Sequence, residues 1–329
     1  MSVKIKDVAA LAGVSVATVS RALGNGPVSA DLRERVEQAV QQLGYRPNLS
    51  ARRLRSQHSQ TVGLIVSDIR NPFFTAVSRA VEDAAYRAGM RVILCNADED
   101  PDKEAMYLRL MQEERVSGVI FSPTGATARR FRPERFEFPV VMIDRAGPSG
   151  LTDAVVLDNA LAARQLVEHL IGRGYRKIGG LFGNSSTTGA ERAAGYEAAL
   201  NQQDLPIAAR FVAPNIEAAE AEVKAWFGEA DRPDALIASN GLLLQGALRA
   251  LMQARLSIPE DVALAGFDND TWTGLVGKGL TVIEQPVYDI GALAMEMLLS
   301  RLENPGLAKR KLVLNGTLLE RGSTAASKI

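Results

Sequence analysis

The sequence predicts an α/β protein in which a small helical head precedes two lobes built on parallel sheets. Over residues 61–143, short apolar runs alternate with longer stretches of helical periodicity, and a second series of the same kind continues to residue 267. Apolar strands separated by helices are typical of a parallel sheet covered on both faces. Before residue 46 the periodicity is helical alone. With 329 residues the chain exceeds the length at which one core usually stops growing, so two or three domains are expected.

The segment 5–23 predicts the first two helices. Apolar residues at positions 5, 8, 9 and 12 give a short helix one apolar face, and Gly13 supplies the permissive backbone of a tight turn. Ser15 is placed to cap a second helix by accepting a hydrogen bond near Thr18. This pattern indicates a helix-turn-helix whose second helix enters a DNA major groove, with an ordinary helical hairpin as the alternative. The side chains expected on its free face are Val16, Ala17, Thr18, Ser20 and Arg21.

A third helix and a linker follow. Ser29 can cap a helix with apolar residues at helical spacing, and Gly44 can end it in a left-handed conformation. The next segment, 45–60, is basic and polar and has too little apolar surface for a core of its own. The sequence therefore predicts a three-helix head and a linker that contains at most one or two helical turns.

Charge is distributed unevenly along the chain. The whole sequence has 38 Lys and Arg against 38 Asp and Glu, but residues 1–60 have nine against four, a net +5 that leaves −5 for the rest. A basic head and a mildly acidic body are expected when only one end contacts nucleic acid. Four basic side chains are interpreted as phosphate contacts or as solvated charges: Lys4, Lys6, Arg33 and Arg46.

Several classes of protein are disfavoured. The single cysteine, Cys95, lies in an apolar run and is expected to be buried. The N-terminus has no signal-peptide pattern, and no run of 18 apolar residues occurs, so a soluble cytoplasmic protein without a membrane partner is expected. His58 and His169 are the only histidines, and residues 179–184 match no nucleotide loop. No metal, cofactor or catalytic residue is expected.

The elements of the two lobes follow from the apolar runs. The first series predicts strands at 61–66, 92–94, 118–121 and 140–143, with helices at about 73–88 and 101–114. The second predicts strands at 178–182, 235–238 and 262–267, with helices around 166–171, 190–202 and 242–254. Two similar lobes in succession favour a hinged pair with a ligand site in the cleft between them.

Seven short motifs occur in order along nearly the whole chain: 7–9 with 13–21, 43–48, 71–74, 143–145, 192–196, 258–262 and 266–268. With these motifs in register, the chain resembles the lactose-repressor (LacI/GalR) family of bacterial transcription regulators. The resemblance implies a head over 1–46, a hinge helix and linker over 47–60, and over 61–329 a sensor like a periplasmic sugar-binding protein. It places lobe 1 at about 61–157 and 286–315 and lobe 2 at about 158–285 and 316–329. It also implies a homodimer on palindromic operator DNA, and the absence of a leucine-heptad tail favours a dimer over a tetramer.

The resemblance assigns DNA contacts residue by residue. Val16 and Ala17 match positions that vary with the operator, and they offer only apolar contacts, so hydrogen-bonded recognition falls to their neighbours. Leu54 matches a leucine that enters the minor groove as a wedge and kinks the duplex. The full set implied is Val16, Ala17, Thr18, Ser20, Arg21, Asn25, Ala51, Arg52 and Leu54.

The resemblance also assigns effector contacts: Phe74, Asp144, Arg145, Arg192, Asn240, Asp268 and Gln285. Trp272 is placed at the rim of the cleft, with core packing as the alternative. Carboxylates, amides and an aromatic ring suit a ligand with many hydroxyls. If both arginines face inward, the ligand carries a carboxylate or phosphate, which favours a sugar acid such as a gluconate or ketogluconate. Gly241 departs from the family pattern, because most relatives have an aspartate there.

The function predicted is therefore a repressor whose operator affinity is controlled by a small sugar-type effector. A soluble sugar-binding receptor is an alternative, but it does not explain the basic head. A sugar-metabolising α/β enzyme is the other alternative, and no nucleophile–base or metal pattern supports it. Induction and co-repression both remain open, as do the operator and its target genes.

Overall fold

The computed structural model describes residues 3–24, 26–45, 60–148 and 150–325. The chain divides into two units, Met1–Ser59 and Gln60–Ile329. The head consists of three helices around a small core that includes the fully buried Val8, Val19 and Val36. These helices are α1 (Ile5–Ala12), α2 (Val16–Leu23) and α3 (Ala30–Leu43).

Local signals explain the ends of these helices. Gly13 has φ +64° in the turn between α1 and α2, and the Ser15 hydroxyl accepts a hydrogen bond of 3.1 Å from the Thr18 N–H, as the sequence predicts. Gly44 ends α3 with φ +61°. Val16 departs from expectation, because it is half-buried against the core of the head instead of facing fully outward.

Two arginines of α3 bind the ends of the preceding helices. Arg33 donates to the carbonyls of Ala22 (2.8 Å) and Gly26 (3.2 Å), and Arg35 donates to that of Ala12 (2.7 Å). A cation at a helix C-terminus pairs with carbonyls that have no partner within the helix. The interpretation of Arg33 as a solvated charge is therefore wrong, because its guanidinium is part of the framework of the head. Its interpretation as a phosphate contact stays a prediction.

Lobe 1 of the second unit is a six-stranded parallel sheet in the order β11-β5-β4-β3-β1-β2. Its strands are β1 (Thr61–Val66), β2 (Arg91–Asn96), β3 (Gly118–Phe121), β4 (Val140–Ile143), β5 (Asp153–Leu157) and β11 (Lys311–Leu314). One core cluster lies beneath α5 (Pro72–Arg87) and α12 (Val287–Glu303). A second cluster lies on the opposite face beneath α6 (Pro101–Glu113), next to α7 (Gly125–Arg130) and the short η1 (Pro133–Arg135).

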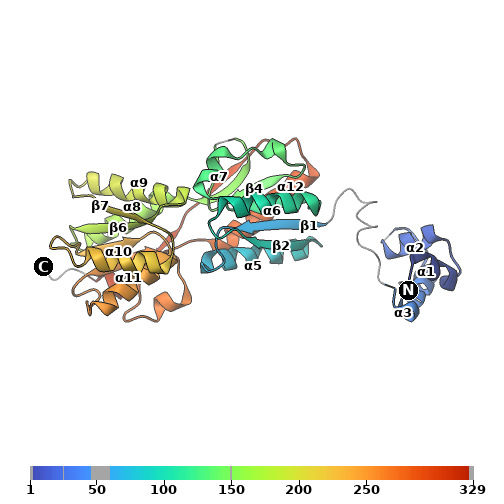
Figure 1. Ribbon diagram of the computed structural model, residues 1–329, viewed down its shortest axis with the longest axis horizontal. Coiled ribbons are helices and arrows are strands. Elements are labelled where there is room, and N and C mark those ends of the chain that lie inside the picture. Colours follow the sequence, from blue (N-terminus) through green and yellow to red (C-terminus); the bar gives the residue numbers. More distant parts are fainter. Residues whose placement is uncertain (1–2, 25, 46–59, 149, 326–329) are drawn as a thin grey trace. The chain divides into compact units, whose positions relative to one another are not determined.

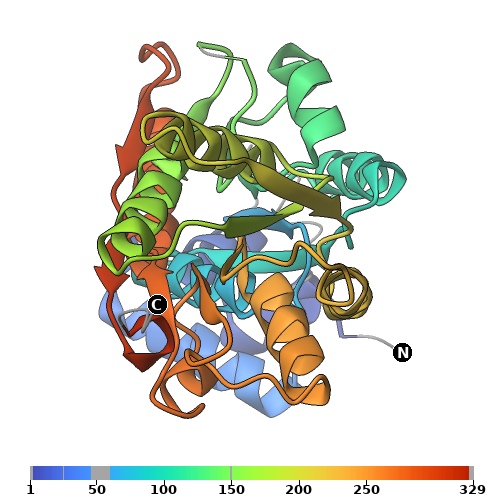
Figure 2. The same ribbon diagram turned by 90° about the vertical axis from the view of Figure 1, so that its left-hand side faces the viewer.

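Lobe 2 repeats this plan with the order β12-β10-β9-β8-β6-β7, in which only β12 is antiparallel. Its strands are β6 (Ile178–Gly183), β7 (Ala208–Val212), β8 (Ala235–Ala238), β9 (Ala263–Phe267), β10 (Thr281–Glu284) and β12 (Thr317–Leu319). Figures 1 and 2 show helices on both faces of the sheet. They are α8 (Asn159–Gly172) and α9 (Thr187–Asn201) on one face and α10 (Ile216–Trp226) and α11 (Gly241–Gln253) on the other, with η2 (Thr271–Gly274) and η3 (Gly322–Thr324) near the sheet.

The chain passes between the lobes three times: between β5 and α8, between β10 and α12, and between β11 and β12. The carboxyl ends of the parallel strands of each sheet therefore lead toward loops that can meet the other lobe, which is where open α/β sheets bind ligands.

The predicted α/β class with parallel sheets is confirmed, and the strands and helices predicted before residue 46 and from residue 61 onward are present with shifts at their ends. The hinge helix expected over 47–60 falls on residues 47–59, which lie outside the described residues. The sequence reasoning missed several elements, among them β7. This strand lies at the edge of its sheet and is half-exposed along most of its length, so it lacks the continuous apolar run of a buried strand. Cys95 is buried as expected, and burial raises the pKa of its thiol. Among the described residues, no helix has the length and apolar character needed to cross a bilayer.

Candidate functional site

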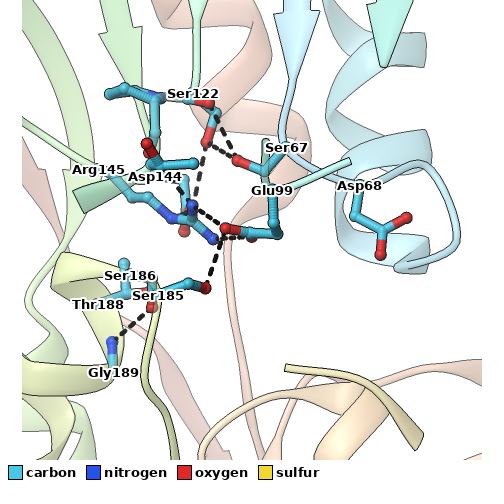
Figure 3. Close-up of polar contacts among 12 residues, drawn as sticks. Ser67, Asp68, Glu99, Ser122, Asp144, Arg145, Ser185, Ser186, Thr188 and Gly189 are labelled. Carbon is cyan, nitrogen blue, oxygen red and sulfur yellow. Dashed lines mark hydrogen bonds and ion pairs between the residues drawn. The ribbon is translucent and has the colours of Figure 1, made fainter. Parts of the chain in front are cut away.

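Hydroxyl and carboxylate groups follow three neighbouring strands of lobe 1. Ser67 comes after β1, Ser122 after β3 and Asp144 after β4, and all three are buried. The two serine hydroxyls lie 3.0 Å apart, and that of Ser122 donates a long 3.5 Å bond to Asp144 (Figure 3). Burial raises the pKa of the Asp144 carboxyl, because desolvation penalises its charged form.

Arg145 is a buried cation with two carboxylate partners. Its fork binds both oxygens of Glu99, at 2.9 and 2.5 Å, and also donates to the Pro123 carbonyl at 3.2 Å. Its Nε atom lies 3.2 Å from Asp144 but has no hydrogen-bond partner in the described structure. Glu99 also accepts a 3.0 Å hydrogen bond from the hydroxyl of Ser185, which belongs to lobe 2 (Figure 3). The carboxylate of Glu99 therefore connects the two lobes at this edge of the cleft.

Arg192 is the buried cation of lobe 2. It extends from α9, where its guanidinium carbon lies 3.9 Å from the centre of the Phe267 ring. Its Nε donates to Asn159 (2.7 Å) and its Nη1 to the Ser239 carbonyl, whereas Nη2 has no hydrogen-bond partner among the described residues. Desolvation lowers the pKa of this guanidinium, although the charges of Asp268 and Asp144 oppose that shift. The charge of one carboxyl group from each lobe thus acts on Arg192.

Asp268 and Gln285 meet where the chain crosses between the lobes. Asp268 follows β9. Its carboxylate accepts a hydrogen bond of 2.6 Å from the Gln285 amide and one of 2.8 Å from the Gly241 N–H. Asn240, just before Gly241, uses its side-chain oxygen to cap α11 at the Leu243 N–H (2.8 Å). These positions of lobe 2 are brought together by the ends of β8, β9 and β10.

A second carboxylate compensates for the glycine at position 241. A Cβ atom added there would lie 3.0 Å from a carboxylate oxygen of Asp270 and 3.3 Å from one of Asp268. Asp270 therefore supplies a carboxylate beside the backbone position at which most relatives have an aspartate. Burial, and next the charge of Asp268, raise the pKa of Asp270 to about 6.

Two predicted aromatic contacts lie mainly in cores. Phe74 is 3% exposed and packs edge-on against Phe73 in the lobe 1 core. Trp272 is half-buried against the lobe 2 core. Neither ring has a contact with the buried arginines in the described structure, so core packing, the alternative for Trp272, fits its position best.

The residues expected to contact DNA are described only in part. On α2, Ala17 and Arg21 are exposed, and Thr18 and Ser20 are half-exposed. Arg21 makes one long contact, 3.4 Å, with the Ala17 carbonyl. Asn25, Ala51, Arg52 and Leu54 lie outside the described residues.

The sequence reasoning missed Glu99 and Ser185. Both residues come shortly after the carboxyl end of a strand, on the cleft side of its sheet. Ligand sites of open α/β sheets lie at such strand ends, so this position was the available sequence signal for a functional role. Their pairing could not be foreseen, because 86 residues separate them.

The comparisons with known proteins agree with this geometry. Residues 4–48 match the family model of bacterial regulatory proteins, lacI family, and residues 167–324 match that of a periplasmic binding protein-like domain. The HTH-type transcriptional regulator KdgR of Bacillus subtilis (strain 168) is 33% identical over 332 residues, which cover 97% of each chain.

Solved structures are similar over the same length. The Lac repressor dimer bound to operator and the anti-inducer ONPF has a TM-score of 0.89 and 25% identity, covering 99% of this chain and 100% of that chain. The complex of the transcriptional regulator CelR with cellobiose has a TM-score of 0.73 and 26% identity, covering 98% of this chain and 99% of that chain. The chain therefore belongs to the LacI family of bacterial regulatory proteins, and it is a DNA-binding transcriptional regulator with a periplasmic-binding-protein-like sensor and not an enzyme.

Proposed function

We propose that this chain represses transcription as a homodimer on palindromic operator DNA, and that a small sugar-type effector in the cleft controls its DNA affinity. The observation that carries this proposal is the convergence of buried charged side chains from both lobes: Asp144 and Arg145 from lobe 1, Arg192 and Asp268 from lobe 2. Burying four ionisable groups is costly for stability alone, so such a cluster favours a ligand site.

The finer form of the proposal is that the effector is a sugar acid such as a gluconate or ketogluconate. Carboxylates and amides that end parallel strands suit several hydroxyls, and Nη2 of Arg192 is available for a carboxylate. The ligand is proposed as an effector and not as a cofactor, since the comparisons identify a regulator. One similar protein, the transcriptional regulator CelR, has a chain of the same fold in complex with the sugar cellobiose.

The DNA contacts are proposed to come from the exposed part of α2. Ala17 and Arg21 present an apolar contact and a hydrogen-bonding cation on one surface of a helix whose other side packs into the head. Leu54 is proposed as the minor-groove wedge of the hinge, with Ala51 and Arg52 beside it.

Control by an effector requires that it bind the two lobe arrangements with different affinity. A first experiment selects an operator from a random duplex library and measures binding of the full chain by fluorescence anisotropy. A thermal-shift screen of sugars, sugar acids and purines then identifies the effector class, because a ligand at 100 times its Kd adds about 2.7 kcal/mol of stability. We expect one class to raise the Tm and to change operator affinity.

A deletion of residues 1–58 separates a regulator from a plain receptor. We expect the remaining unit to keep effector binding and to lose operator binding, because the head and the sensor are separate compact units. If an effector that binds the cleft leaves the operator affinity of the full chain unchanged, the proposed control is wrong.

A further inference from the structure

The carboxylate of Glu99 already occupies the position that an anionic effector would be expected to take. The two terminal nitrogens of the Arg145 guanidinium can bind both oxygens of a carboxylate, which is a common geometry for such pairs. Both nitrogens donate hydrogen bonds to Glu99. Arg145 is 5% exposed and Glu99 16% exposed, so water competes weakly for this pair. An effector carboxylate can reach the fork only if Glu99 leaves it.

The backbone holds Glu99 in this place. Asp98 and Glu99 have φ +58° and +56°, which only a few non-glycine residues adopt. The Glu99 N–H bonds the carbonyl of Ser67 (2.9 Å), and Asp100 caps α6 immediately afterwards. The turn directs Asp98 outward, where it pairs with Arg70 (2.9 Å) at the surface, and Glu99 inward. Backbone strain of this kind is concentrated at functional sites.

The same carboxylate fastens the lobes together. The Ser185 hydroxyl of lobe 2 donates a hydrogen bond to Glu99. The Ser185 carbonyl accepts a hydrogen bond of 3.0 Å from the Gly125 N–H of lobe 1. A Cβ atom at Gly125 would lie 3.0 Å from the oxygen of that carbonyl, so the backbone segments of the two lobes approach closely here. One of these two links between the lobes depends on Glu99.

We propose that Glu99 is a built-in competitor for the carboxylate of the effector, and that its displacement from Arg145 releases the hydrogen bond to Ser185 between the lobes. Binding of an anion at Arg145 thereby allows lobe 2 to move relative to lobe 1 at this edge of the cleft. A neutral polyol has no charge to compete with Glu99 and leaves the link in place. This inference rests on the proposed function, since it assumes an effector in this cleft.

Charge balance in the cleft supports the displacement. With Glu99 in place, an added anion meets a site that already contains the buried carboxyl groups of Asp144 and Asp268, and Arg145 is already paired. Once Glu99 rotates toward solvent, the effector replaces it as the partner of Arg145 and no extra buried charge is created. A purely structural pair would neutralise Arg145 without affecting the distance between the lobes.

The test measures that distance in the full chain without DNA. Nitroxide labels at Ala105→Cys on α6 and Gln202→Cys after α9, both exposed, report the separation of the lobes by pulsed electron spin resonance. Labelled chains are diluted with unlabelled ones so that each distance belongs to one chain. The native Cys95 is buried, and a chain without the two new cysteines controls for its labelling.

We expect Glu99→Ala and Ser185→Ala to broaden the distance distribution toward longer values, because each removes one partner of the hydrogen bond between the lobes. Asp98→Ala removes a carboxylate from the same turn without contact to Arg145 or Ser185, and we expect it to match the wild type. D-gluconate added to the wild type is expected to act like Glu99→Ala, whereas D-glucitol, the matched uncharged polyol, has no effect. We also expect Glu99→Ala to bind D-gluconate about tenfold more tightly.

Three results would overturn the inference: a Glu99→Ala distribution that matches the wild type, equal effects of D-gluconate and D-glucitol, or no response of the wild type to D-gluconate. A failure of the proposed function is distinguishable, since it appears as an operator affinity that no sugar or sugar acid changes.

Discussion

Asp144 and Asp268 occupy equivalent positions in the two lobes. Each follows the third strand in the order of its sheet, β4 or β9, with a positive φ of 63° or 76°. Each continues the ladder by donating its N–H to a carbonyl on the adjacent strand, Val155 at 3.2 Å or Ile283 at 2.9 Å. The left-handed conformation turns both carboxylates out of their sheets, and the cleft thus receives one matching carboxylate from each lobe.

Gly241 and Asp270 should be energetically coupled. Gly241→Asp places a third carboxylate beside Asp268 and Asp270, so we expect the free energy of unfolding to fall by about 2 kcal/mol at pH 7. Gly241→Ala measures the steric part of that loss. Adding Asp270→Ser should restore part of the stability, with a coupling energy of about 1 kcal/mol or more in denaturant unfolding. Strict additivity of the two changes would contradict the packing described.

The raised pKa of Asp270 predicts a pH dependence of stability. Its pKa is about 6 in the folded chain and about 3.9 in an unfolded one, so the folded state binds more protons between these values. Stability from this group is therefore greatest below about pH 4 and is lost as the pH rises through about 6. We expect Asp270→Asn to reduce the loss between pH 4.5 and 7 by about 1 kcal/mol, after allowance for solvent screening. Identical pH profiles for both proteins would contradict this.

Arg33 and Arg21 should separate stability from DNA binding in the head. Arg33→Gln removes charged donors from the end of α2, and we expect a loss of about 1–2 kcal/mol in thermal unfolding followed by circular dichroism. Arg21→Gln changes an exposed side chain and should leave stability within about 0.5 kcal/mol. Its operator affinity should fall about tenfold or more in anisotropy titrations. A stable Arg33→Gln head with normal unfolding would refute the capping role.

Arg192 should be required for the effector response and not for operator binding. Arg192→Lys keeps the charge but loses the planar contact with Phe267 and the bond to Asn159. We expect effector binding, measured by calorimetry, to weaken at least about tenfold while operator affinity without effector stays unchanged. Arg210→Lys is the matched control, because Arg210 lies 5.2 Å over the Trp226 ring near the edge of the same sheet and is partly exposed. An equal effect of both variants would argue against a ligand role for Arg192.

The sequence by itself determined the head and the plan of the lobes. Helical spacing, Ser15 and the two glycines at 13 and 44 act within one or two turns of chain, so local signals suffice to place α1, α2 and α3. Apolar runs placed the buried strands for the same reason, whereas the half-exposed edge strand β7 carried no such run.

The tertiary structure alone decided which charges meet. Arg33 binds carbonyls of another helix, Asp270 lies beside Gly241, and Glu99 bonds Ser185, 86 residues away. Single-sequence patterns report local periodicity, but the partner of a buried charge depends on which strand ends the fold brings together. The sequence therefore predicted a cleft with two arginines, and only the fold showed that Glu99 holds one of them.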